Sequence, residues 1–267
     1  MIQQINNRIA GRLLRIIDKS IYDNLKKYNG YIAGGAVLSS FTGKKINDFD
    51  LYFTTKEDAT LFTESMKLKD KCTKWKDFGN REKIKLDSYK NNILFFETDN
   101  SLTFMAKGQK YQIITAFYLP MEELFKKYDF TICMAGYSIA NNIFYLYDTF
   151  LEDVADKRLK FNIGTEYPIC SLLRVLKYQR KGYVINGLEM IKMALTIHHL
   201  DIENYGDLKK QLQGIDTLFL KELTDTLSNN DYKEKKFQFD EFLKMFDDYL
   251  SNAENSFFKD YNEDPEE

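Results

Sequence analysis

The sequence is poor in cysteine and histidine. Its three cysteines, Cys72, Cys133 and Cys170, are scattered, and no Cys-x-x-Cys pair occurs among the 267 residues. Scattered thiols argue against a structural zinc site and a disulfide framework, so we expect a reducing, cytoplasmic compartment. The two histidines, His198 and His199, are adjacent. Neighbours on a helix point about 100° apart, so we expect them to pack rather than to share a metal.

Long apolar runs are also missing. No window approaches about 18 uninterrupted apolar residues, so we expect no transmembrane span and no membrane partner. The first residues, MIQQINNRIAGRLL, do not have the layout of a signal peptide. The net charge of −2 gives no overall attraction to nucleic acid, so any nucleic-acid surface must be local. The oligomeric state stays open.

The most informative stretch is residues 30–53, GYIAGGAVLSSFTGKKINDFDLYF. Its short apolar run, residues 31–33, predicts a buried strand. Gly34 and Gly35 then predict a turn at which the backbone can approach a ligand closely, because glycine has no Cβ. Residues 36–41 favour the first turns of a helix, whose unpaired N–H groups would point at that turn as at an anion site.

Two aspartates follow this turn in the alternating run DFDLYF, which predicts a strand. A side-chain period of two puts Asp48 and Asp50 on one face, with Cα atoms about 6.5–7 Å apart. Taken alone, a Gly-Gly pair is more often plain turn chemistry, and Asp-x-Asp is more often a solvated strand edge. Together, a carboxylate pair facing a glycine turn suits divalent metal binding and phosphoryl transfer.

The spacing of these residues resembles the head of the polymerase-β-like nucleotidyltransferases, in particular the class II tRNA CCA-adding enzymes and bacterial poly(A) polymerases. The first family pattern is a Gly-Gly-Ala-Val turn, a helix, a glycine and Asp-x-Asp. It is matched at Gly34, Gly35, Ala36, Val37, Gly43, Asp48 and Asp50. A second pattern, Arg-Arg-Asp-Phe-Thr-Ile-Asn-Ala-Met-Ala-Tyr, is followed without a gap at Asp129, Phe130, Thr131, Ile132 and Tyr137, with Met134 and Ala135 at the places of its Ala-Met pair.

The resemblance, which covers roughly residues 30–181, implies an α+β fold. A nucleotidyltransferase head with a mixed sheet flanked by helices would occupy residues 1–160. An all-helical neck and body would occupy residues 161–260, and residues 261–267 would be an acidic tail.

The same resemblance implies a metal-dependent enzyme that moves NMP from an NTP such as ATP to a hydroxyl, with an RNA 3′ end as the favoured acceptor. Asp48 and Asp50 would be the catalytic residues and would hold Mg²⁺ in a two-metal site. The nucleotide-binding residues would be Gly34, Gly35, Ser39, Lys44, Asp129, Arg158, Arg174 and Lys177.

Three departures from the family weaken parts of this interpretation. The third carboxylate of the superfamily is replaced by Gln112, and a Glu-Asp pair that helps to select the base is replaced by Cys170 and Ser171. Lys127 and Tyr128 stand in place of the paired arginines. Two alternatives therefore stay open: a catalytically weak nucleotide- or RNA-binding relative, and a nucleotidyltransferase that modifies a protein or small molecule.

Periodicity predicts the other elements. An apolar stripe predicts one helix over residues 2–28. Alternation predicts strands over 93–97, 102–106 and 111–117, and helices are expected from Pro168 onward, including one over 216–227. The lysine-dense segment 67–90 contains aromatic residues, which would suit a single-stranded nucleic-acid groove, but a solvated connection is the favoured interpretation.

Overall fold

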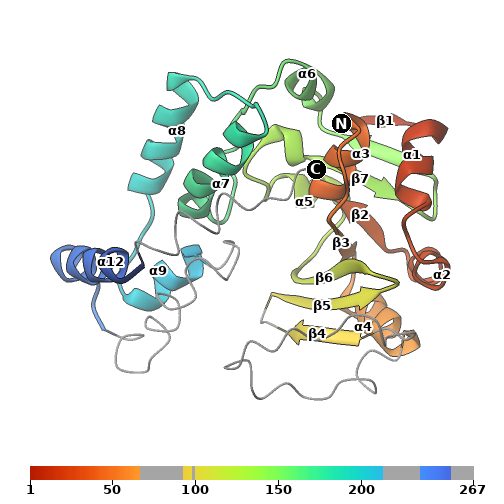
Figure 1. Ribbon diagram of the computed structural model, residues 1–267, viewed down its shortest axis with the longest axis horizontal. Coiled ribbons are helices and arrows are strands. Elements are labelled where there is room, and N and C mark those ends of the chain that lie inside the picture. Colours follow the sequence, from red (N-terminus) through yellow and green to blue (C-terminus); the bar gives the residue numbers. More distant parts are fainter. Residues whose placement is uncertain (67–92, 98–99, 213–234, 254–267) are drawn as a thin grey trace. The chain divides into compact units, whose positions relative to one another are not determined.

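The computed structural model describes residues 1–66, 93–97, 100–212 and 235–253 (Figure 1). The chain forms two compact units, unit 1 from Met1 to Gly164 and unit 2 from Thr165 to Glu267. The lysine-dense segment 67–90, the helix expected over 216–227 and the acidic tail 261–267 all lie outside the described residues.

Unit 1 is built on an eight-stranded sheet with the strand order β1-β8-β7-β2-β3-β6-β5-β4. The strands are β1 (Ile2–Gln4), β2 (Tyr31–Ala33), β3 (Asp48–Phe53), β4 (Ile93–Glu97), β5 (Ser101–Ala106), β6 (Gln109–Tyr118), β7 (Ala135–Ser138) and β8 (Ile143–Leu146). Strands β3 and β6 run parallel, whereas the other neighbouring pairs that the structure describes are antiparallel. The predicted α+β class with a mixed sheet is therefore confirmed.

Helices cover both faces of this sheet. One face is covered by α1 (Asn7–Leu14), α2 (Lys19–Lys27), α3 (Gly35–Thr42) and α4 (Lys56–Ser65), and the Phe62 ring of α4 packs 5.2 Å from the Phe53 ring. On the other face, α5 (Met121–Phe125) packs against Tyr31 and Tyr52, whose rings stack at 5.6 Å. A strand's side chains alternate between faces, so Asp48 and Asp50 lie on the α5 face with Tyr52.

A stack of three aromatic rings fixes the register of the central strands. Phe49 of β3 stacks on Tyr111 of β6 with centroids 5.4 Å apart, and Tyr111 stacks on Phe104 of β5 at 5.3 Å. All three side chains are fully buried. A slip of one residue would expose this stack and would turn Asp48 and Asp50 into the core, so burial of the rings holds both aspartates on their face.

The single helix predicted over residues 2–28 is wrong. Residues Ile2–Gln4 form β1, which pairs with β8, and the two helices α1 and α2 follow separately. Asn6 caps α1 and Asp18 caps α2, each accepting a hydrogen bond from a backbone N–H in the first turn. The same helical spacing occurs in both short helices, but these capping side chains start each helix anew.

The remaining elements of unit 1 follow α5. A short 3-10 helix, η2 (Thr131–Cys133), leads into β7, and α6 (Phe150–Ala155) follows β8.

Unit 2 contains α7 (Pro168–Arg180), α8 (Gly187–His198), α9 (Tyr205–Leu212) and α12 (Phe239–Ala253) in its described part. Tyr205, Leu208 and Leu212 of α9 form its buried cluster, against which Leu173 of α7 and Phe242 of α12 pack. The helical region expected beyond Pro168 is thus observed. No helix within the described ranges is long and apolar enough to cross a membrane.

Candidate active site

The candidate site begins with the aspartate pair on β3. Asp50 is paired with Ala33 of β2, and Gly34 follows Ala33 directly. The antiparallel pairing therefore brings the start of β3 to the glycine turn that ends β2. Asp50 is half-buried, and the Asp48 side chain is 42% exposed. Both aspartates share a face with the ring of Tyr52 and lie beside the turn, as the sequence predicts.

Strand β6 lies on the other side of the aspartates and is parallel to β3. Its register sets Lys110 beside Asp48 and Gln112 beside Asp50, so the sequence KYQ runs alongside DFD. The Nζ of Lys110 lies 3.5 Å from Asp48 Oδ2. The Gln112 amide donates a hydrogen bond to Thr103 Oγ1 on β5 at 3.1 Å. The carboxylate row of β3 thus faces an ammonium and an amide.

Glu97, a possible substitute for the missing third carboxylate, belongs to a different row of the sheet. It is paired with Leu102, which is paired with Ile113, which is paired with Leu51. Asp50 belongs to the adjacent row, with Gln112 and Thr103. The backbone register therefore gives no support to Glu97 as a partner of Asp50.

The glycine turn has a backbone conformation that other residues rarely adopt. Gly34 has φ 74° and ψ −130°, and it stands at the N-cap of α3. Its N–H donates to the Ala135 carbonyl of β7 at 2.9 Å, so that amide is already used inside the sheet. Gly35 is exposed at the first position of α3. The first-turn amides of α3, rather than that of Gly34, are therefore the backbone donors suited to an anion.

A half-buried tyrosine, Tyr128, lies against this turn. The Tyr128 hydroxyl donates to the Tyr52 hydroxyl at 3.1 Å, and a Cβ added to Gly34 would lie 3.3 Å from the Tyr128 oxygen. Burial, followed by the influence of Tyr52 and then of the Asp50 carboxylate, raises the pKa of Tyr128 well above its usual value. Tyr128 therefore stays protonated, and its ring lies close to both Gly34 and Tyr52.

Three other predicted nucleotide-binding residues of unit 1 lie in less direct positions. Ser39 is half-buried one helical turn along α3 from Gly35, and its carbonyl accepts from the N–H of Lys44 at 3.0 Å. Lys44 is exposed just beyond the C-terminal end of α3. Asp129 is 2% exposed, and its Oδ1 accepts from the N–H of Phe130 at 3.0 Å. The carbonyl of Asp129 also accepts from the N–H of Asn162 at 2.7 Å, so both its side chain and its backbone are engaged within the protein.

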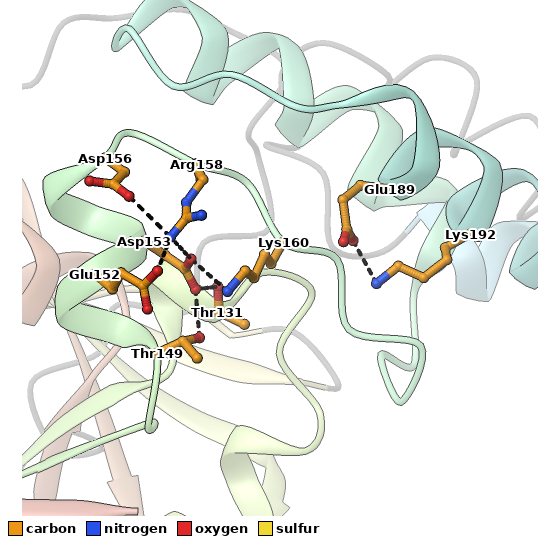
Figure 2. Close-up of polar contacts among 9 residues, drawn as sticks. All are labelled: Thr131, Thr149, Glu152, Asp153, Asp156, Arg158, Lys160, Glu189 and Lys192. Atoms are coloured by element: carbon orange, nitrogen blue, oxygen red, sulfur yellow. Dashed lines mark hydrogen bonds and ion pairs between the residues drawn. The ribbon is translucent and has the colours of Figure 1, made fainter.

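Arg158 belongs to a cluster around the buried carboxylate of Asp153 (Figure 2). Its guanidinium pairs with Glu152, with Asp156 at 3.1 Å and with Asp153 at 3.6 Å. The first of these contacts, a hydrogen bond to Glu152, is the largest cause that raises the pKa of Arg158. The guanidinium is 40% exposed, so a phosphate would have to compete with these carboxylates for it.

Arg174 and Lys177 lie on α7 of unit 2, where Arg174 is half-buried and Lys177 is exposed. On the same helix, Cys170 and Ser171 stand where the resemblance to the CCA-adding enzymes implies a Glu-Asp pair. Both side chains donate hydrogen bonds to backbone carbonyls. The Cys170 thiol donates to the Gln211 carbonyl at 2.7 Å, and the Ser171 hydroxyl donates to the Tyr167 carbonyl at 3.2 Å. Both side chains are buried, so neither presents an acceptor to a base.

A cavity of about 230 Å³ lies elsewhere in unit 1. Its lining includes Tyr31 at the start of β2 and Thr54 just after β3. The aspartates and the glycine turn lie at the opposite ends of these two strands. This cavity is therefore separate from the candidate site.

The aspartate pair fits a magnesium ion. Mg²⁺ is commonly held by one or two carboxylates together with substrate phosphates and water. Asp48 and Asp50 supply such a pair next to a turn suited to phosphate. No cluster of three or more His, Cys, Asp or Glu side chains that could hold a metal occurs in the described parts of the chain. The donor set therefore suits binding that is completed by substrate.

The sequence did not predict that Lys110 lies beside Asp48 or that Tyr128 lies beside Gly34. The signal for Lys110 was present, because Lys110 and Gln112 repeat the two-residue spacing of Asp48 and Asp50. Only the parallel register between β3 and β6 reveals which lysine meets which aspartate.

Comparisons with known proteins agree with this fold. The CCA-adding enzyme in complex with CTP matches with a TM-score of 0.52 and 15% identity, over 79% of this chain and 51% of that chain. An apo form of the CCA-adding enzyme matches with a TM-score of 0.51 and 14% identity, over 85% of this chain and 55% of that chain. At such identities the likeness shows the fold alone, and the expected polymerase-β-like nucleotidyltransferase fold is confirmed.

Sequence comparison identifies a relative whose name differs from those of the structural neighbours. The protein named Gabija anti-defense 2 from Bacillus phage SPbetaL7 is 31% identical over 252 residues, which are 93% of this chain and 58% of that protein. The chain thus spans less than two thirds of that relative's length. A family model described as Gabija anti-defense 2 family protein matches residues 4–157. Because this match covers more than half of the sequence, the chain belongs to the Gabija anti-defense 2 family.

Proposed function

We propose that the chain is a metal-dependent nucleotidyltransferase that moves NMP from an NTP to a hydroxyl acceptor, and that the acceptor is an RNA 3′ end. The observation that carries the proposal is the pairing of Asp50 with Ala33, because it joins the carboxylate pair to the glycine turn. A carboxylate pair and a phosphate-binding turn at one strand end are what nucleotidyl transfer requires.

Each part of the site has a role in this reaction. Asp48 and Asp50 hold Mg²⁺, which when bound supplies positive charge that neutralises the triphosphate. The backbone at Gly35 and the first turn of α3 binds the β,γ-phosphates, and Lys110 adds a cation beside Asp48. The hydrogen bond between the Tyr128 and Tyr52 hydroxyls links the side chain beside Gly34 to the strand that carries the aspartates.

The bond changes are those of phosphoryl transfer. The acceptor oxygen forms a bond to the α-phosphorus while the bond from that phosphorus to the leaving oxygen breaks. Pyrophosphate leaves, and the proton of the acceptor hydroxyl is lost to solvent or to a carboxylate. Alignment and charge neutralisation supply most of the catalysis in such reactions.

The family name suggests the biological setting. A relative is called an anti-defense protein, so we propose that transfer by this chain acts against a bacterial defence. In that setting the modified RNA belongs to the infected cell. The candidate substrate class is thus RNA with a free 3′ hydroxyl.

A second candidate function is nucleotide or RNA binding without turnover. Gln112 favours it, because an amide is a weaker metal ligand than a carboxylate and cannot accept a proton near neutral pH. The hydrogen bond from Gln112 to Thr103 further ties this side chain to the sheet.

One experiment separates the candidates. The purified chain is incubated with Mg²⁺, total bacterial RNA and protein, and each of the four NTPs labelled at the α-phosphate. We expect label in RNA, removed by RNase and absent with an Asp48→Asn/Asp50→Asn variant. Label in protein would overturn the RNA acceptor while keeping nucleotidyl transfer. Nucleotide binding without label in any fraction would overturn transfer and leave the binding function.

A further inference from the structure

The charges around the aspartate pair do not match a site for two divalent cations. On the described strands, the face that carries Asp48 and Asp50 is completed across β6 by Lys110 and Gln112. Two carboxylates, one ammonium and one neutral amide leave a single net negative charge. Two divalent ions held side by side repel each other strongly, and here the triphosphate would have to supply most of the negative charge that offsets this repulsion.

Fold stability does not account for the position of Lys110. Its side chain is 40% exposed and that of Asp48 is 42% exposed, so water screens their attraction. Ion pairs of this exposure contribute little to folding. Both groups are nevertheless open to solvent at the strand end where the glycine turn lies, so a bound triphosphate could meet both.

The register of the central strands sets the position of Lys110 in the sheet. The buried stack of Phe49, Tyr111 and Phe104 holds β3, β6 and β5 in register. Tyr111 lies between Lys110 and Gln112, so its burial forces both neighbours to the opposite, aspartate-bearing face. The strand register therefore places Lys110 directly beside Asp48 on this face.

We propose that Lys110 takes the place of one of the two metal ions of nucleotidyl transfer, and that this site binds a single divalent cation with its NTP. The proposal rests on the function proposed above and names how that same site is charged. Asp48 and Asp50 together hold the one ion, and the Lys110 ammonium supplies the second positive charge to the phosphates. The amide of Gln112 in place of a third carboxylate agrees with this proposal, because that carboxylate would bind a second metal ion that the site does not hold.

Metal stoichiometry tests the proposal directly. Mn²⁺ binding is measured by electron paramagnetic resonance on the full chain, with an ATP analogue that has carbon in place of the oxygen between the α- and β-phosphorus. We expect one Mn²⁺ per chain in the saturated complex, and the same with Lys110→Arg, which keeps the charge. We expect Lys110→Gln combined with Gln112→Glu to bind two.

Single substitutions give a graded readout. Removing a positive charge next to Asp48 should tighten binding of Mn²⁺ alone, so Lys110→Gln should lower its Kd about tenfold. The matched control is Lys107→Gln, since Lys107 lies on the same hairpin but pairs with Asp18 at 2.6 Å. This control should leave Mn²⁺ affinity unchanged. Circular dichroism confirms that each variant is folded.

The outcomes separate this inference from the proposed function. Two Mn²⁺ ions per wild-type complex, together with NMP transfer, would overturn the role of Lys110 and keep the enzyme. Equal Mn²⁺ affinities for Lys110→Gln and wild type would overturn it as well. Absence of both Mn²⁺ binding and transfer in the wild type would overturn the proposed function itself.

Discussion

At the candidate site, the charge and exposure of a side chain determine whether it contributes mainly to chemistry or to folding. The Asp48 side chain is 42% exposed, and Asp50 is half-buried next to the glycine turn. Carboxylates in such positions make small contributions to packing, so their loss should affect chemistry far more than folding.

The first prediction concerns these two carboxylates. Asp48→Asn or Asp50→Asn should lower the rate of NMP transfer by at least about 100-fold, because each removes charge that holds the metal and the triphosphate. The free energy of unfolding, measured by urea titration, should change by less than about 1 kcal/mol. Unchanged transfer of labelled NMP in either variant would remove that aspartate from the proposed site.

The second prediction concerns Gln112. Gln112→Glu should keep or raise the transfer rate, because it restores a proton acceptor beside Asp50. The rate is measured with Mg²⁺ and each NTP against the wild type. A fast wild type with an inactive Gln112→Glu variant would contradict the assignment of Gln112 to the third-carboxylate position.

Local pattern predicted only part of the site. The sequence predicted the strand DFDLYF and the glycine turn, because both depend on neighbouring residues and on alternation. Lys110 could not be assigned, since its meeting with Asp48 depends on the parallel pairing of two distant strands. Other members of the predicted set, such as Arg158 and Asp129, make hydrogen bonds or ion pairs with protein groups close to them in sequence, and the family pattern does not specify these contacts.

Among the secondary-structure elements, a buried carboxylate joins η2 to α6. Asp153 of α6 is fully buried, and its Oδ2 accepts from Thr131 Oγ1 at 2.8 Å and from Thr149 Oγ1 at 2.6 Å. Its Oδ1 lies 3.0 Å from Lys160 Nζ. Figure 2 shows these groups converging on one side chain, which therefore cross-links segments on both sides of β7 and β8.

The third prediction follows from this cross-link. Asp153→Ala should lower the free energy of unfolding by about 3–5 kcal/mol, because it leaves buried partners without their acceptor. Asp153→Asn should cost less, since an amide oxygen still accepts from the threonines. The matched control is Asp156→Ala. The Asp156 side chain is 54% exposed and pairs with Arg158, as Asp153 does, so its loss should cost about 0–1 kcal/mol. Equal losses in Asp153→Ala and Asp156→Ala, by urea titration, would contradict this role.

The elements themselves were predicted unevenly. The strands were anticipated because their alternating residues match one buried and one partly open face, as in β5 and β6. The N-terminal region was predicted wrongly because the apolar spacing continues across two helices, while the break between them is set by the cap at Asp18. Helical periodicity detects a buried face, but it does not count the helices that share that face.

At the scale of the whole molecule, the chain combines a nucleotidyltransferase fold with membership of an anti-defense family. A shared fold at 15% identity does not by itself fix a function. Cys170 and Ser171 are both engaged in hydrogen bonds inside unit 2.

The fourth prediction is that the chain does not build an ordered C-C-A end. Arg174 and Lys177, which the resemblance assigns to nucleotide binding, carry only hydrogen-bond donors, so we expect a preference for bases with carbonyl acceptors, such as U or G, or little selectivity. Arg174→Ala should weaken the use of all four NTPs by about one to two decades. Sequencing of the RNA 3′ ends checks both points, and homogeneous C-C-A additions would contradict the prediction.

The parallel pairing of β3 with β6 also has a consequence for how the chain acquires its site during folding. A hydrogen bond between these strands, from Gln109 to Asn47, joins residues 62 positions apart, whereas Gln112 and Thr103 in the β5–β6 hairpin are only 9 apart. Local hairpins close within microseconds, and long loops close more slowly. In pulsed hydrogen exchange we expect amides of the hairpin to gain protection before those of β3. The aspartates would then meet Lys110 late, so an incomplete or partly folded chain would have no competent site.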